Sequence, residues 1–169
     1  MTTFRVPRTR KHKLPATVLR MDNLDSGLQV TLEVVYDDEE MVELDAMVNA
    51  GWWRGRCCAY TVPSDISRFA EALLQFTDGG PSAALEAGAD NGIGFISLRF
   101  YRINGSGHIA GHARLASGYV PTVHRSEEIS RLAVEFRAET WGIIKFARQL
   151  LNLAQAKKGR ATLAIELDQ

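Results

Sequence analysis

The sequence has no long apolar run, few cysteines and no excess of charge of either sign. Its 169 residues include 2 cysteines and 5 prolines, and its 20 basic residues equal its 20 acidic residues. No segment is apolar for long enough to span a bilayer, and the first residues do not have the pattern of a signal peptide. We therefore expect a cytoplasmic protein without a membrane partner. A near-neutral chain also lacks the general attraction to polyanions, so nucleic acid is not an expected partner.

The two cysteines do not suggest a disulfide or a metal site. Cys57 and Cys58 are adjacent in a segment with strand periodicity, and neighbouring strand residues project to opposite faces. This placement disfavours both a mutual disulfide and chelation of one ion. We expect buried or half-buried free thiols.

Signals for catalysis, cofactors and metals are equally scarce. His108 and His112 are four residues apart, but in a strand this spacing separates them by roughly 13 Å, too far for one ion. Asn104–Gly107 precedes a strand and lacks the lysine and hydroxyl of a phosphate-binding loop, so it is interpreted as a hairpin turn. Asp37–Glu40 lacks the ligand pattern of a calcium loop and is interpreted as a solvated turn. The sequence therefore predicts no catalytic residue, cofactor or metal ligand.

The length and composition predict one globular domain preceded by a basic arm. Residues 1–16 are rich in Arg and Lys, contain Pro7 and Pro15, and show little hydrophobic periodicity, which is typical of a flexible arm. Residues 17–169 carry enough apolar residues for a single core.

Hydrophobic periodicity predicts an antiparallel β protein with two helices. Alternation of apolar and polar residues, separated by turn-forming residues, marks the strands; these are expected at Thr17–Met21, Leu28–Tyr36, Met41–Ala50, Trp52–Tyr60, Ser82–Ala87, Ile93–Ile103, His108–Ser117, Leu132–Phe136 and Ala161–Leu167. Helical spacing marks two amphipathic segments, one starting after Pro63 with Ser64 or Asp65 as its cap and one starting with Thr140 as its cap. The expected fold class is α+β. A sheet of about seven to nine strands, strongly curved or two-layered, carries one helix after the fourth strand and one near the C-terminus.

The segment around the paired tryptophans is the most informative part of the chain. Alternation places Trp53, Gly55 and Cys57 on one face of a strand, and Trp52, Arg54, Arg56 and Cys58 on the other. The arginines require water or carboxylate partners, so their face is expected to be the outer one. The preceding segment should form a hairpin with this strand through Ala50 and Gly51, which would place Glu43 and Asp45 on the same face as the arginines.

This arrangement resembles the WapI-type bacterial immunity proteins. The resemblance is carried by Val48-Asn49-Ala50-Gly51-Trp52-Trp53-Arg54-Gly55-Arg56 followed by a helix with Phe69 and Leu73, and by Asn104-Gly105-Ser106-Gly107-His108-Ile109. The second motif also resembles a related bacterial domain family with no assigned function. The resemblance covers about Leu28 to Leu153. The basic arm, the Ala161–Leu167 segment and the second tryptophan depart from it.

The resemblance implies a small bacterial protein that binds and neutralises a polymorphic toxin domain without chemistry of its own. The candidate binding residues are aromatic and arginine side chains, the types that dominate protein interfaces; they are Trp52, Arg54, Arg56, Tyr60, Arg99 and Tyr101. Two alternatives remain open from the sequence. One is a small-molecule-binding scaffold or enzyme with a pocket between sheet and helices, and the other is a structural homo-oligomer, such as a homodimer, joined through strand edges.

Overall fold

The computed structural model describes residues 27–89, 94–103, 108–118, 127 and 129–167. The predicted arm at 1–16, the predicted strand Thr17–Met21 and the predicted turn Asn104–Gly107 lie outside these residues. Within them, eight antiparallel strands form two four-stranded sheets, and two helices complete an α+β fold. The predicted class and the two-layered alternative are therefore confirmed.

The first sheet, sheet A, is built mainly from the first three strands. Its strand order is β3-β2-β1-β8. The strands are β1 Gln29–Asp37, β2 Val42–Ala50, β3 Trp53–Thr61 and β8 Gly159–Ala164. A two-residue loop joins β2 to β3, because Ala50 pairs with Trp53. Gly51 has a φ of 69°, as the first central residue of such tight hairpin loops requires. Trp52 therefore lies in the turn, whereas the sequence analysis placed it in the strand.

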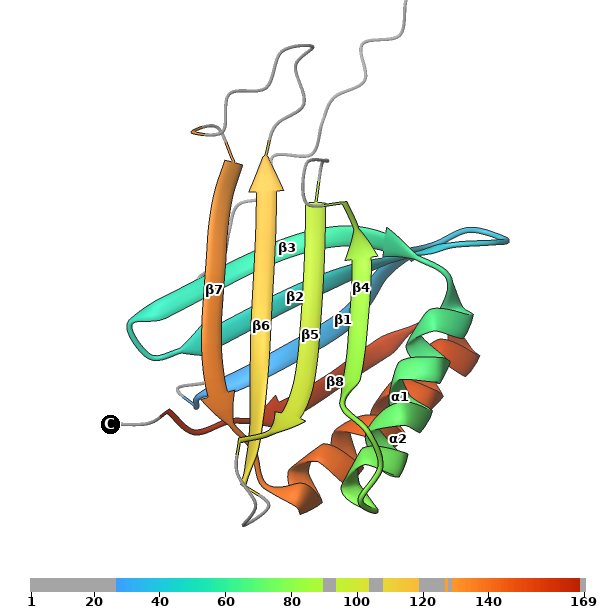
Figure 1. The fold of residues 1–169 in the computed structure, drawn as a ribbon. Coiled ribbons are helices and arrows are strands. Elements are labelled where there is room, and N and C mark those ends of the chain that lie inside the picture. The colour runs from blue at the N-terminus through green and yellow to red at the C-terminus, as the bar shows by residue number, and fades with distance from the viewer. Residues whose placement is uncertain (1–26, 90–93, 104–107, 119–126, 128, 168–169) are drawn as a thin grey trace, which may run out of the picture.

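The second sheet, sheet B, lies across the first. Its strand order is β4-β5-β6-β7. The strands are β4 Ala83–Gly88, β5 Gly94–Arg102, β6 Ile109–Gly118 and β7 Ile129–Arg137. Figure 1 shows the strands of sheet B running across those of sheet A, with both helices together at one end. The start of β3 extends beyond β7, so part of sheet A has no strand of sheet B above it (Figure 1).

The two helices begin where the sequence predicts, but without the predicted caps. Helix α1 spans Pro63–Thr77 and helix α2 spans Thr140–Ala156. The N-cap residues are Val62 and Glu139, and neither makes a side-chain capping bond. The expected capping roles of Ser64, Asp65 and Thr140 are thus wrong. Pro63 itself starts α1, since its fixed φ suits the first helical turn and its missing N–H has no partner to lose there.

The described residues form two halves with the same order of elements. Each half has three strands, a helix and one more strand: β1-β2-β3-α1-β4 and β5-β6-β7-α2-β8. The last strand of each half joins the other half's sheet, because β4 pairs with β5 and β8 pairs with β1. This exchange ties the halves into a single unit.

The two helices carry the same motif at equivalent positions. Ile-x-x-Phe-Ala-x-x-Leu-Leu runs over Ile66–Leu74 in α1 and over Ile143–Leu151 in α2. The first four named residues of each copy are buried in the common core. The helices pack against each other (Figure 1), so this repeated stripe forms the centre of the helical layer.

Candidate functional site

Four of the six candidate residues lie along the outer side of β3 and its turn. We call this the β3 outer surface, made of Trp52, Arg54, Arg56 and Tyr60. All four side chains are exposed, whereas the alternate residues Cys57 and Ala59 are 4% exposed and face the core. The predicted outer face is therefore confirmed for Arg54 and Arg56, and the predicted inner face for Cys57 and Ala59.

Trp52 is the most exposed large side chain of the surface. Its exposed fraction is 100%, because it sits at the tip of the β2–β3 hairpin. Beside it, Arg54 donates from Nε to the carbonyl of Gly51 at 3.2 Å. This bond holds Arg54 against the turn, so the tip presents an indole and a guanidinium next to each other.

Arg56 neutralises a buried carboxylate. Its Nε lies 2.9 and 2.8 Å from the two oxygens of Asp45, and Nη2 also contacts Asp45. Asp45 is 5% exposed, so its charge depends on this partner. The hydrogen bond and charge of Asp45 raise the pKa of Arg56. The predicted pairing of outer-face charges is thus confirmed for Arg56 and Asp45.

Tyr60 completes the surface at the other end of β3. It pairs across the strands with Glu43, and Tyr36 lies opposite Glu43 on β1. Partial desolvation, followed by the negative charge of Glu43, raises the pKa of the Tyr60 hydroxyl. A hydrogen bond to Glu43 adds to this shift, so the hydroxyl stays protonated at neutral pH.

The prediction of free thiols is confirmed, but the expected burial is right for Cys57 and wrong for Cys58, which lies on the outer face of β3. Cys57 is buried and Cys58 is exposed, and both are free thiols. Cys57 Sγ lies 3.0 Å from the carbonyl of Ala116. Desolvation, reinforced by the charge of Asp45, raises the pKa of Cys58 to about 11. Neither thiol has the lowered pKa of a reactive cysteine.

The other two candidates, Arg99 and Tyr101, lie on a different surface. They project from β5 on the outer side of sheet B, where the Arg99 guanidinium lies 5.5 Å from the centre of the Tyr101 ring. The Tyr101 hydroxyl donates to Glu135 of β7, and this bond raises the pKa of the hydroxyl. The six candidates therefore do not form one site, because β3 and β5 belong to different sheets.

His112 also lies on the outer side of sheet B. It pairs with Arg99 on one side and Glu135 on the other. In the ranges that the structure describes, no group of His, Cys, Asp and Glu side chains could hold a metal ion.

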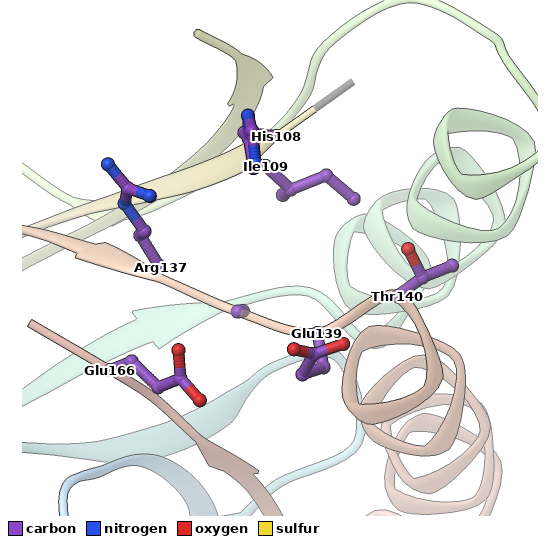
Figure 2. A pocket seen from close by; sticks show the side chains of 7 residues that line it. His108, Ile109, Arg137, Glu139, Thr140 and Glu166 are labelled. Carbon is purple, nitrogen blue, oxygen red and sulfur yellow. The ribbon is translucent and has the colours of Figure 1, made fainter. Parts of the chain in front are cut away.

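Two shallow grooves lined by described residues are the candidate ligand sites. The first, shown in Figure 2, lies between the ends of β6 and β7 and the start of α2, and has a volume of about 200 Å³. In Figure 2 the side chains of His108 and Arg137 lie on one side of it, and the carboxylates of Glu139 and Glu166 on the other. The second, of about 350 Å³, runs between α1 and β4. Both volumes are at or below the lower end of the roughly 300–1,000 Å³ typical of small-molecule sites.

The exposure of Trp53 does not follow from the sequence pattern. This residue faces the same side as Gly55, toward sheet B, yet it is 66% exposed. Gly55 lies under Leu132 of β7, whereas Trp53 lies two residues nearer the hairpin tip and beyond that strand. Only the position of β7 could have revealed this, since alternation by itself predicts a buried side chain.

The sequence has no match among protein-family models or curated proteins. Of the helices in the described residues, neither is long and apolar enough to cross a membrane.

Proposed function

We propose that this chain is a non-enzymatic protein-binding module, and that it acts in the bacterial cytoplasm as an immunity protein that neutralises a cognate polymorphic toxin. The observation that carries the proposal is the fully exposed Trp52, which adjoins Arg54 at the tip of the β2–β3 hairpin. Tryptophan and arginine are the residue types most enriched among side chains that dominate binding energies. The resemblance to WapI-type immunity proteins supplies the class of partner.

The two arginines of the β3 outer surface have different partners and therefore different roles. Arg56 is bound to the buried Asp45, so its first role is to hold that carboxylate. In the described structure, Arg54 donates a hydrogen bond to a carbonyl of the turn. Its positive charge is therefore available to an acidic group on a partner, while Tyr60 offers a phenol at the far end of the strand.

A small toxin domain would cover this surface and its surroundings. A stable inhibitory interface buries roughly 1,600 Å² in total, of which few side chains supply most of the free energy. We expect Trp52 and Arg54 to be such residues. The two shallow grooves give a small-molecule scaffold less support, because the first is smaller than a typical small-molecule site and the second is only slightly above the lower limit.

The experiment starts from the protein encoded by the neighbouring reading frame. Its product is purified and titrated calorimetrically against the full chain and against Trp52→Ala and Arg54→Ala. We expect each substitution to weaken binding at least tenfold, and Arg68→Ala on the exposed side of α1 to leave it unchanged. Binding that is indifferent to Trp52→Ala and Arg54→Ala would mean that the surface is wrong. A neighbouring metabolic enzyme with no complex would contradict the immunity role.

Light scattering distinguishes a monomer from the alternative of a homo-oligomer. A monomer over the concentration range of the titration is expected. A dimer that dissociates when the partner is added would instead indicate that the same surface also binds a second copy.

A further inference from the structure

We propose that the outer edge of β7, where Glu166 alone pairs among the described residues, takes up an extended segment of the protein partner as an added strand that packs on Trp53. The inference rests on the proposed protein-binding function and specifies how the partner is held. It starts from the four sheet edges. A free edge presents unpaired backbone groups that attract another strand, so most proteins cover such edges.

At three of the four edges, another described part of the chain contacts the edge strand. The edge of β3 lies against the start of β5, where a β-carbon on Gly94 would overlap the carbonyl of Cys58. At the edge of β8, Gln149 of α2 accepts a hydrogen bond from the amide of Thr162 at 2.9 Å. The edge of β4 lies beside α1. β7 is the last strand of sheet B, and among the described elements only Glu166 pairs with its outer side.

Glu166 also shows which backbone groups of β7 point outward. The amide of Arg137 donates to Glu166 at 2.7 Å, and the amide of Glu166 donates to Arg137 at 2.9 Å. The N–H and C=O of Arg137 therefore point away from β6. Because these directions alternate along a strand, those of Ala133 and Glu135 point outward as well. The β6–β7 ladder has no bulge that would interrupt this alternation.

Trp53 lies where the added strand would rest. It shares a face with Gly55, which contacts Leu132 from below. Two residues of β3 span roughly 7 Å, and neighbouring strands are roughly 4.8 Å apart. The overhang of the β2–β3 hairpin past β7 is thus wide enough for one strand. An inward-facing apolar side chain on that strand would cover the 66% exposed indole.

The same overhang disfavours a second copy of this chain as the occupant. Antiparallel pairing of two β7 strands centred near Leu132, where the hairpin crosses, would bring the two protruding hairpins beneath the same pair of strands, where they would compete for the same space. A single extended segment avoids this collision. Donor-strand recognition of this kind takes affinity from backbone bonds and specificity from alternate side chains.

The side chains of β7 define the chemistry of the segment. Arg131 and Glu135 lie on the outer face on either side of Ala133, while Leu132 and Val134 face inward and are half-buried. A complementary antiparallel segment carries a basic residue opposite Glu135, an acidic residue opposite Arg131 and aliphatic residues between them. The orientation continues the antiparallel bridge that Glu166 begins.

The test uses the peptide acetyl-Lys-Val-Thr-Val-Glu-amide and the full chain labelled with nitrogen-15. We expect the backbone amides of Ala133 and Glu135 to shift on titration at least twice as far as those of Leu132 and Val134, which point toward β6. Trp53 fluorescence, isolated in the Trp52→Phe/Trp141→Phe background, should move to shorter wavelength. The same peptide N-methylated on threonine should bind at least fivefold more weakly, since it loses a backbone donor.

Two variants separate edge pairing from nonspecific contact. Ala133→Pro removes an outward N–H and leaves the hydrogen bonds between β6 and β7 intact. Trp53→Ala removes the indole on which the added strand would pack. Both should weaken the peptide at least fivefold, whereas Trp52→Ala should not. If Ala133→Pro fails to fold, Trp53→Ala still tests the added strand, because it changes an exposed side chain.

Shifts that do not alternate along β7, or binding unaffected by Trp53→Ala, would overturn this inference. So would a dimer in sedimentation that Trp53→Ala dissociates, because a second copy would then be the occupant. Loss of partner binding in Trp52→Ala with no peptide binding at β7 would refute the added strand and leave the proposed function standing. Peptide binding at β7 together with partner binding that Trp52→Ala leaves unchanged would refute the β3 outer surface alone.

Discussion

Gly55 of β3 lies directly under Leu132 of β7: a β-carbon at position 55 would come within 2.8 Å of Leu132 Cδ2. The two sheets approach each other closely at this crossing because the lower strand has no side chain there. The contact fixes where β7 crosses the hairpin, and therefore which part of β3 remains uncovered.

Gly55→Ala is expected to destabilise the protein by about 1–3 kcal/mol, the usual cost of overpacking. The penalty should shrink when Leu132 is also changed to alanine, since the clashing atoms are gone. Urea unfolding of the two single variants and the double variant measures the coupling. Gly142→Ala in α2 is the control, because its β-carbon would make an ordinary 3.4 Å contact with Leu163 and alanine favours helix by up to about 1 kcal/mol. Additive free energies for Gly55→Ala and Leu132→Ala would contradict this reading.

Arg56→Ala should cost about 1–3 kcal/mol of unfolding free energy, because it leaves the buried Asp45 carboxylate without its main partner. The matched control is Arg54→Ala, two residues away on the same face, which should change stability by less than about 0.5 kcal/mol. Chemical denaturation at neutral pH compares them. Equal effects of the two substitutions would show that the contact between Arg56 and Asp45 adds no more to the free energy of unfolding than an exposed arginine does.

Phe69 and Phe146 occupy the same position of the repeated helical motif and are 2% and 0% exposed. Phe→Ala at either site is expected to cost about 3–5 kcal/mol, with similar values for both. Phe→Leu at each site gives a milder comparison if the alanine variants do not fold. Arg68→Ala and Lys145→Ala on the exposed sides of the same helices should stay within about 0.5 kcal/mol. A large effect at only one phenylalanine would mean that the halves do not share the core equally.

Cys58 should make the protein less stable as the pH rises from about 9 to about 11. Its pKa is raised from 9.0 to about 11 in the folded protein, so in this window the unfolded chain has lost the thiol proton while the folded chain keeps it. The unfolded state then binds fewer protons, and stability falls with rising pH. Urea midpoints across this window should fall less steeply in Cys58→Ser than in the original chain.

The same raised pKa predicts slow alkylation of Cys58. At pH 8 iodoacetamide should react about tenfold more slowly than with an unperturbed thiol, since the smaller thiolate fraction outweighs its greater nucleophilicity. Asp45→Asn should speed the reaction, because the charge of Asp45 contributes to the raised pKa. A rate equal to that of free cysteine would contradict the assigned environment.

Local patterns predicted most of the elements because strand and helix periodicities are short-range properties. Alternation separated Cys57 from Cys58 and placed Arg54 and Arg56 outward, as the structure confirms. The repeat over Ile66–Leu74 and Ile143–Leu151 was also present in the sequence, and comparing the two helical segments would have indicated the two equivalent halves. The caps were predicted wrongly, since a capping residue type does not ensure a capping bond.

Short-range periodicity sets which side of each strand and helix is apolar, and hence an α+β protein with two helices on antiparallel sheets. The β2–β3 hairpin could be predicted locally, but the neighbours of β4 and β8 depend on long-range packing, since each crosses to the other half's sheet. The same packing puts Arg99 and Tyr101 on a different sheet from Arg54. The tertiary structure also decided that Trp53, on an inward-facing position, is 66% exposed. The physical reason is that periodicity reports the direction of a side chain, whereas its burial depends on whether another strand lies above it.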